Sequence, residues 1–287
     1  MASNPHSEKA HQALSELKQL SSTTEGWNFV QEKEGVKLYN KTVDGNPIPI
    51  VRGDIVLEGD YTVQQALTVC TLPGCRKIWD DKFDASEVKA WYSRYETLFW
   101  TKLKTPWPIS PRDIAGTSLR EFSEEEGYIV MTSVTDPAVP VISGNVRANL
   151  MVSGWKVAKT STGAISLIYI TQIDLAGSIP ASFLKTVQQQ VPLCARKVAD
   201  YIKDHGYPPL LVSLSAQFKQ ESFDHAKGSY EVQLEGEGEA RWSISGKMYP
   251  GGFRAELVGT GTCEAVSVHE LVVKGISGPV TVKILKK

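Results

Sequence analysis

The sequence has little of what most enzymes and metalloproteins need. Its 287 residues include four cysteines, with no C-x-x-C pair among them, and five histidines. The cysteines lack metal-ligand spacing, so we expect reduced, mostly buried thiols and no metal site. The chain contains no H-E-x-x-H, G-x-S-x-G or Walker-type sequence. We therefore expect neither catalysis nor a bound cofactor.

An excess of one charge and long apolar runs are also missing. Lys and Arg number 31 and Asp and Glu 32, a net charge of −1 that does not favour a nucleic acid as partner. No run approaches the ~18 apolar residues of a membrane span, and residues 1–13 lack the apolar core of a secretory signal. We expect a soluble, cytoplasmic protein, although a longer parent chain with an anchor stays open.

The chain is long enough for two domains. Hydrophobic residues make up 41%, enough for a packed core, and the length exceeds the ~100–150 residues of a typical domain. Gly206–Pro209 reads as a boundary. We predict one domain over residues 1–207 and a β-rich accessory domain over residues 208–287. Short alternating segments and recurrent glycines in this tail predict a small, sandwich-like antiparallel unit.

Hydrophobic periodicity predicts an α+β first domain. An amphipathic helix is expected over Ser7–Leu20 and a long helix over Pro180–His205, with a kink at Pro192. Five β-prone segments lie before the long helix: Ser86–Lys104, Ile114–Phe122, Tyr128–Val134, Val146–Ala158 and Ala164–Leu175. This order indicates one strongly bent antiparallel sheet with the long helix laid across it.

The most distinctive segment is Thr105–Asp113, which reads Thr-Pro-Trp-Pro-Ile-Ser-Pro-Arg-Asp. Its prolines can neither continue a helix nor occupy a central strand, yet the segment lies between two apolar stretches. We predict a rigid connection between two strands. Arg112 and Asp113 are expected to form a structural ion pair or to cap backbone carbonyls in this turn.

The same segment resembles the signature of START domains, the lipid-transfer modules related to the steroidogenic acute regulatory protein. Further motifs follow in the order of the family: Arg76–Asp80, Gly144–Ala148, Ser153–Trp155, Asp174–Pro180 and Pro192–Cys194. The resemblance covers roughly residues 20 to 207. It implies a helix-grip fold, in which a curved antiparallel sheet grips a long C-terminal helix and a lipid cavity lies between them.

By this resemblance the protein binds and transfers one lipid, a sterol, another apolar lipid or a phospholipid, without being an enzyme. Its partners would be that lipid and, transiently, a membrane surface at which it is peripheral. Two alternatives stay open. One is a cavity enzyme of the cyclase or hydratase type, with Tyr95, Tyr169 or Arg147 as the ionisable group. The other is a ligand-gated adaptor whose residues 210–287 bind a protein.

In START domains a loop closes the mouth of the cavity beside the long helix. The corresponding residues 136–144 carry Val139, Val141 and Ile142 on a proline-rich loop. We expect them to form a gate that dips toward a membrane, because a lipid chain exposed to water costs ~0.8 kcal/mol per CH₂. The alternative is an ordinary buried connection.

Candidate lipid-binding residues follow from the resemblance and from alternation along the strands. Arg76 matches an arginine that contacts the headgroup in phosphatidylcholine-binding relatives, with an ion pair to Asp80 or Asp81 as the alternative. An inward Arg147 would need a partner. The predicted lipid-binding set is Arg76, Trp91, Tyr95, Phe99, Ile114, Gly116, Ser118, Arg147, Tyr169, Thr171, Phe183, Val187 and Val191.

The resemblance does not identify the lipid. Phe99 and Ser118 stand where sterol-binding members carry a buried acid and arginine. Ile114 and Gly116 stand where phosphatidylcholine binders place tyrosines for a choline cage. Both departures favour a rather apolar lipid, or one whose polar end is held by Tyr169, Thr171, Gln172 or the backbone. The sequence also leaves open the oligomeric state, the membranes involved and the role of the β-rich tail.

Overall fold

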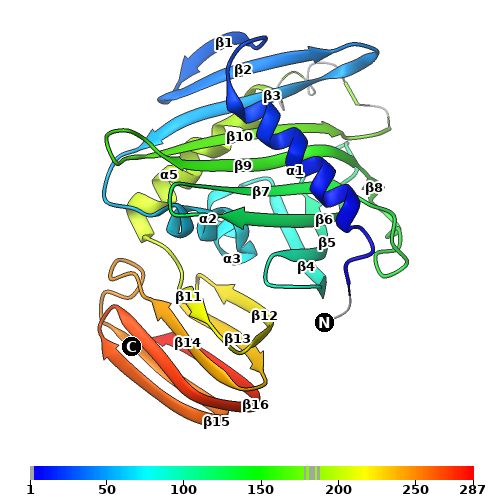
Figure 1. The fold of residues 1–287 in the computed structure, drawn as a ribbon. Coiled ribbons are helices and arrows are strands. Elements are labelled where there is room, and N and C mark those ends of the chain that lie inside the picture. The colour runs from blue at the N-terminus through cyan, green and yellow to red at the C-terminus, as the bar shows by residue number, and fades with distance from the viewer. Residues whose placement is uncertain (1–2, 178, 181–184, 186–187) are drawn as a thin grey trace. The chain divides into compact units, whose positions relative to one another are not determined.

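The computed structural model describes residues 3–177, 179–180, 185 and 188–287 (Figure 1). The chain forms two compact units. The larger unit comprises the chain up to residue 63 and residues 79–199, and the C-terminal unit comprises residues 64–78 and 200–287. A short segment from the first half of the chain thus belongs with the tail. The domain boundary at residue 207 stays a prediction.

The larger unit is built on a curved sheet of ten strands (Figure 1). The strands run in the order β1-β2-β3-β10-β9-β7-β6-β5-β4 and pair antiparallel, while β8 pairs parallel with β6. This sheet, together with the helices, confirms the predicted α+β class. Its strands are β1 (Asn28–Lys33), β2 (Val36–Val43), β3 (Asn46–Leu57), β4 (Phe83–Trp91), β5 (Glu96–Leu103), β6 (Arg112–Phe122), β7 (Glu126–Ser133), β8 (Val146–Arg147), β9 (Asn149–Lys159) and β10 (Ile165–Asp174).

Helix α1 (Ser7–Ser22) crosses one face of this sheet, over β10, β9, β7 and β6 (Figure 1). Its buried side chains include Ala10, Leu14 and Leu17, spaced for one helical face, and they pack on Val130 and Val152. The helix confirms the prediction over Ser7–Leu20 and ends two residues later. We call the face of the sheet that α1 covers the outer face and the opposite one the inner face.

The C-terminal helix follows β10. Residues 188–190 are helical, the 3₁₀ turn η1 spans Val191–Leu193, and α5 spans Cys194–His205. A 3₁₀ turn stands where the kink at Pro192 was expected, because proline cannot donate the backbone bond that a straight α-helix needs there. Much of the predicted first half of this helix, residues 181–184 and 186–187, lies outside the described residues. Helices α2 (Val63–Thr71) and α3 (Pro73–Trp79) come earlier in the chain.

The C-terminal unit contains a second sheet of six strands, which confirms the predicted β-rich extension. Its order is β11-β14-β16-β13-β12, with β15 pairing along β16. The strands are β11 (Leu210–Leu214), β12 (Gln217–Asp224), β13 (Ser229–Glu235), β14 (Gly238–Ser243), β15 (Phe253–Ser267) and β16 (Glu270–Lys286).

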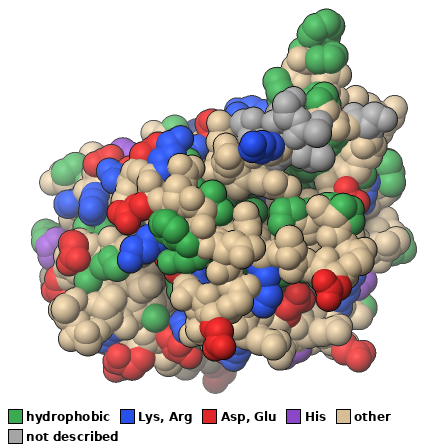
Figure 2. Space-filling view, turned by 90° about the horizontal axis from the view of Figure 1, so that it is seen from above, with side chains coloured by type: hydrophobic (Ala, Val, Ile, Leu, Met, Phe, Trp, Pro, Cys, Tyr) green, Lys and Arg blue, Asp and Glu red, His purple; other side chains and the backbone are tan. Residues whose placement is uncertain are grey.

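Charged side chains of both signs lie on the surface: on the face of the molecule shown in Figure 2, acidic and basic side chains are interspersed, as the near-zero net charge leads one to expect.

Two of the predicted β-prone segments are each divided into two strands. The segment Val146–Ala158 comprises β8 and the greater part of β9, with a break at Ala148. The segment Ser86–Lys104 is not a single strand but the hairpin of β4 and β5, which turns at residues 92–95. The hydroxyl of Ser93 accepts hydrogen bonds from the backbone N–H groups of Tyr95 and Glu96, 3.0 Å each, and so stabilises the turn. Trp91 and Tyr95 therefore do not lie on one strand with Phe99.

Candidate functional site

The inner face of the sheet carries the candidate site. Side chains alternate between the two faces of a strand, and in β6 Leu119 packs on the outer face with α1. Ile114, Gly116 and Ser118 are separated from Leu119 by an odd number of positions, so they lie on the inner face. In β5, Phe99 pairs with Gly116 and Thr97 with Ser118. The structure thus brings four of the predicted residues, Phe99, Ile114, Gly116 and Ser118, onto one surface.

One part of this surface is apolar. Phe99 and Ile114 form a cluster with Ala148, Leu150 and Leu175, and Met131, Ile173 and Ile179 pack against it from partly buried positions. The Phe99 ring lies over residue 116, where a Cβ would stand 2.5 Å from its Cζ atom. Gly116 is required here because any larger residue would displace the ring.

Hydroxyl groups lie beside this apolar cluster. The Thr97 and Ser118 hydroxyls are 2.6 Å apart, and those of Ser153 and Tyr169 are 3.0 Å apart. Thr171 follows Tyr169 by two residues on β10, so it shares the inner face, and it is 3% exposed. These groups can donate or accept hydrogen bonds without carrying charge. The surface is therefore suited to a mostly apolar molecule with a small, neutral polar group.

Arg112 and Asp113, which end the proline-rich segment, do not pair with each other. Asp113 is fully buried and binds Arg147 through two contacts of 3.0 Å, and it also accepts a 2.8 Å hydrogen bond from Trp100. Burial alone would raise the pKa of Asp113, but the hydrogen bonds from Arg147 and Trp100 outweigh it and the pKa is lowered. The ion pair of Asp113 is thus with Arg147, its register partner across β6 and β8.

Arg112 caps backbone carbonyls, which was the second of the two expectations. Its guanidinium donates to the carbonyl oxygens of Leu175, Ser110 and Ala176. Adjacent residues of a strand point to opposite faces, so Arg112 and Asp113 are directed away from each other. The expectation that these two neighbours pair with one another is corrected, and each instead fixes a different loop.

The predicted gate loop, residues 136–144, is fixed at both ends. Asp136 binds His6 at 2.8 Å, a hydrogen bond that lowers the pKa of Asp136, and the Arg147 guanidinium donates to the carbonyls of Val139 and Pro140. Val139 is 3% exposed and packs with Leu98, Ala115 and Val134, so it is part of the core. Val141 and Ile142 are 70% and 43% exposed.

Other predicted residues lie elsewhere. Arg76 is on α3, in the C-terminal unit, and Tyr95 is 42% exposed at the β4–β5 turn, in contact with Phe122. Trp91 ends β4, with the Arg120 guanidinium 6.0 Å from its ring centre. Phe183 and Val187 lie outside the described residues. Val191 begins η1, which contacts β2, β3 and β10.

The sequence reasoning missed residues that shape the inner face. A Cβ at residue 53 of β3 would stand 2.3 Å from the Pro192 carbonyl oxygen, so Gly53 permits the close approach of η1. Trp155 packs against Tyr169 and Trp79, with ring centres 4.6 and 6.1 Å apart. A glycine within a strand pattern is a signal that could have indicated the contact of Gly53 with η1, while no local pattern indicates the aromatic stack.

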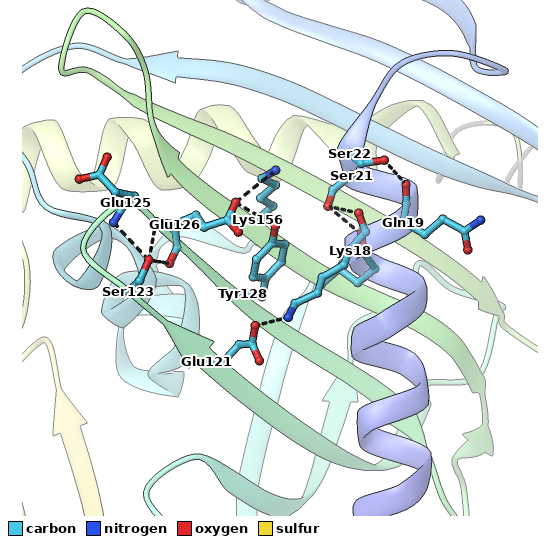
Figure 3. Close-up of polar contacts among 11 residues, drawn as sticks. Lys18, Gln19, Ser21, Ser22, Glu121, Ser123, Glu125, Glu126, Tyr128 and Lys156 are labelled. Carbon is cyan, nitrogen blue, oxygen red and sulfur yellow. Dashed lines mark hydrogen bonds and ion pairs between the residues drawn. The ribbon is translucent and has the colours of Figure 1, made fainter.

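The outer face is closed by α1 and by polar contacts at its edge (Figure 3). The Tyr128 hydroxyl donates to Glu126 at 3.1 Å, and Lys18 and Lys156 lie 5.3 and 5.7 Å from the Tyr128 ring centre. Lys18 also pairs with Glu121. Because α1 packs on this face and fills it with its own side chains, the inner face is the better candidate for a ligand.

Two kinds of site are not found in the described part of the chain. Among the described residues, no group of three His, Cys, Asp or Glu side chains could hold a metal ion. None of the helices within the described ranges is long and apolar enough to cross a membrane.

Comparisons with known proteins agree with this geometry. Residues 7–201 match the family model of the START domain. The chain is 24% identical over 171 residues to "Uncharacterized protein PA1579" of Pseudomonas aeruginosa, covering 59% of this chain and 82% of that protein. It is 23% identical over 184 residues to human StAR-related lipid transfer protein 13, covering 63% of this chain but 16% of that protein.

Solved structures show the same fold. Human StAR-related lipid transfer protein 5 superposes with a TM-score of 0.63 at 19% identity, covering 69% of this chain and 96% of that structure. The STAR-related lipid transfer protein fragment from Xanthomonas axonopodis has a TM-score of 0.51 at 22% identity, covering 63% and 98%. Both superpositions cover less than three quarters of this chain.

Proposed function

This chain belongs to the START domain family, whose members generally bind or transfer lipids, and we propose that it carries one lipid on the inner face of its large sheet. The observation that carries the proposal is the composition of that face. An apolar cluster around Phe99 and Ile114 adjoins the neutral hydroxyls of Thr97, Ser118 and Tyr169. A lipid with a long apolar body and a small polar end matches this distribution.

A neutral polar end fits better than an anionic headgroup. The Arg147 guanidinium, the cation that we expected to reach inward, is already bound by Asp113 and by two loop carbonyls. Gln172 donates to the Ile48 carbonyl at 2.7 Å, whereas Tyr169 and Thr171 lie on the inner face. We therefore favour a sterol or another apolar lipid over a phospholipid.

Two exposed loops support contact with a membrane during transfer. Trp107 is 93% exposed in the proline-rich loop, and Val141 and Ile142 are exposed in the gate loop. A 2.9 Å backbone hydrogen bond from Val146 to Pro111 ties the ends of these loops together. Tryptophan prefers the membrane interface, and prolines on either side of Trp107 limit the entropy lost when it binds. We propose that both loops touch the membrane while the lipid passes.

Native mass spectrometry tests the proposal. The full chain is incubated with vesicles that contain cholesterol, ceramide, phosphatidylcholine and phosphatidylinositol, separated from them, and weighed. We expect one lipid per protein, with the neutral lipids preferred. Ser118→Trp should occupy the inner face and abolish the adduct, whereas Thr162→Trp, on an exposed turn, should not. A protein that stays empty after this challenge refutes the proposal.

A further inference from the structure

The C-terminal unit contains a second group of polar side chains, which the lipid-binding role does not use. The Tyr201 hydroxyl of α5 lies 2.7 Å from Nδ1 of His225, which follows β12. It is also hydrogen-bonded to the thiol of Cys75 on α3. Tyr201 is 3% exposed and Cys75 is fully buried. Three segments that are distant in the sequence are therefore joined by one chain of hydrogen bonds.

Close packing accompanies these hydrogen bonds. A Cβ at Gly74 of α3 would stand 1.9 Å from the Phe223 carbonyl oxygen of β12, so only glycine allows this approach. The Lys247 ammonium donates to the Lys203 carbonyl of α5 at 2.6 Å. Within this unit, the end of α5 is thus held by side chains of the second sheet and its loops.

The hydrogen-bond chain depends on a neutral His225. A neutral imidazole offers Nδ1 as an acceptor for the Tyr201 hydroxyl proton, and the Tyr201 oxygen can then accept the thiol proton of Cys75. A protonated imidazole carries a proton on Nδ1 and offers no acceptor. Protonation therefore removes the hydrogen bond that Tyr201 donates to His225. Otherwise His225 must donate to Tyr201, and Tyr201 must in turn donate to Cys75.

The surroundings of His225 oppose protonation. The His205 ring of α5 lies 4.7 Å from it, Lys286 of β16 is a nearby cation, and Asp224 is the nearby anion. Burial, followed by the effects of His205 and Lys286, lowers the pKa of His225, and Asp224 offsets this only in part. A histidine with a lowered pKa stabilises the folded unit above its ordinary pKa of ~6.5, and this stability declines as the pH falls below that value.

We propose that the C-terminal unit is a pH-sensitive clamp on helix α5, in which neutral His225 holds Tyr201 and protonation releases the end of the helix. The helix begins in the larger unit and ends in the C-terminal one. The consequence for lipid retention rests on the proposed function, because η1, which directly precedes α5, contacts β2, β3 and β10 of the sheet that would hold the lipid. Tyr201 and His225 are positioning residues in this scheme, and neither needs to touch the ligand.

Hydrogen exchange of the full chain tests the clamp without any lipid. Exchange is measured at pH 7.5 and 5.5 for peptides from α5, corrected for the intrinsic rate, with α1 as internal reference. We expect α5 to exchange faster at pH 5.5 by a factor of at most about ten, because that pH lies one unit below the ordinary histidine pKa. The α1 peptides should change less.

Three variants separate the clamp from a general loss of stability. His225→Gln keeps an acceptor that cannot titrate, so the pH effect on α5 should disappear. Tyr201→Phe removes the hydroxyl and should leave α5 fast at both pH values. His269→Gln, a histidine of the same unit, should behave like the wild type. A wild type without the pH effect, or a His225→Gln variant that retains it, overturns the proposal.

Lipid release links the clamp to transport. A protein loaded with a cholesterol analogue should release it faster at pH 5.5 than at 7.5, and the His225→Gln variant should not. If α5 shows the expected pH-dependent hydrogen exchange but the protein binds no lipid, the clamp is supported and the carrier role is refuted. Lipid that binds but leaves at the same rate at both pH values overturns the role of the clamp in retention.

Discussion

Replacement of Arg147 by methionine should destabilise the larger unit through Asp113. The change leaves a carboxylate without its ion-pair partner at a position that is 0% exposed, where Trp100 and Asn145 still donate side-chain hydrogen bonds to it. Removing one partner of a buried pair typically costs about 3–5 kcal/mol. The Arg147 side chain is 24% exposed, which weakens the original pair, so we expect about 2–3 kcal/mol.

Chemical denaturation followed by hydrogen exchange on peptides from β5 and β6 measures this cost. A local readout is needed because two compact units need not unfold together. Asp113→Asn should cost less than Arg147→Met, because Arg147 can reach water and an asparagine oxygen can still accept from Trp100. The double variant should be more stable than Arg147→Met alone, since it removes the unpaired charge.

The loss of stability in the Arg147→Met variant should depend on pH. In the wild type the lowered pKa of Asp113 contributes stability above the ordinary value of about 3.8, and this contribution is lost as the pH falls through the folded pKa. In the Arg147→Met variant the buried carboxyl can take up a proton, so its defect should shrink between pH 7 and pH 4. A defect below about 0.5 kcal/mol at pH 7, or one that does not shrink, would refute the reasoning.

Three further predictions address other parts of the molecule. Trp107→Ala should weaken binding to vesicles about tenfold, by loss of apolar burial, while Phe29→Ala, an exposed aromatic on β1, should not; equal losses in a flotation assay would argue against the membrane contact. Leu17→Ala should cost about 2–5 kcal/mol in urea unfolding, because the fully buried side chain leaves a cavity between α1 and the sheet, and a cost under 1 kcal/mol would contradict that packing. Burial raises the pKa of the Cys75 thiol to about 12, so at pH 8 iodoacetamide should leave Cys70 and Cys75 unmodified until urea unfolds the protein; mass mapping that finds either thiol alkylated in the native state would count against their burial.

Much of the architecture could be predicted because it follows from local patterns. The apolar residues of α1 repeat at helical spacing, so one buried face was visible in the sequence. The prolines around Trp107 allow neither a helix nor a central strand, which fixed a loop between β5 and β6. Strand register was harder to predict from the sequence. The segment from Trp91 to Trp100 has apolar and polar side chains on both faces, and a short polar turn at Ser93 divides it into two strands.

Part of the candidate site was predictable from the family resemblance together with the alternation of side chains along strands. Phe99, Ile114, Gly116 and Ser118 share the inner face because a strand has a period of two. Val139 lies in the core, which fits the alternative of a buried connection, and nothing in a proline-rich loop tells which apolar side chain turns inward. The hydroxyl contact between Ser153 and Tyr169 joins residues on two strands and depends on their register.

The sequence by itself determined the family, the α+β class, the helix α1 and the loop that holds Trp107, because each depends on neighbours along the chain or on a motif of fixed spacing. Only the tertiary structure decided which partners the buried charges take. Asp113 stands beside Arg112 in the sequence but binds Arg147, because the two neighbours face opposite sides of β6 while parallel pairing with β8 brings Arg147 alongside. The contact of Tyr201 with His225 likewise exists only in the folded chain, where segments distant in sequence exclude water together.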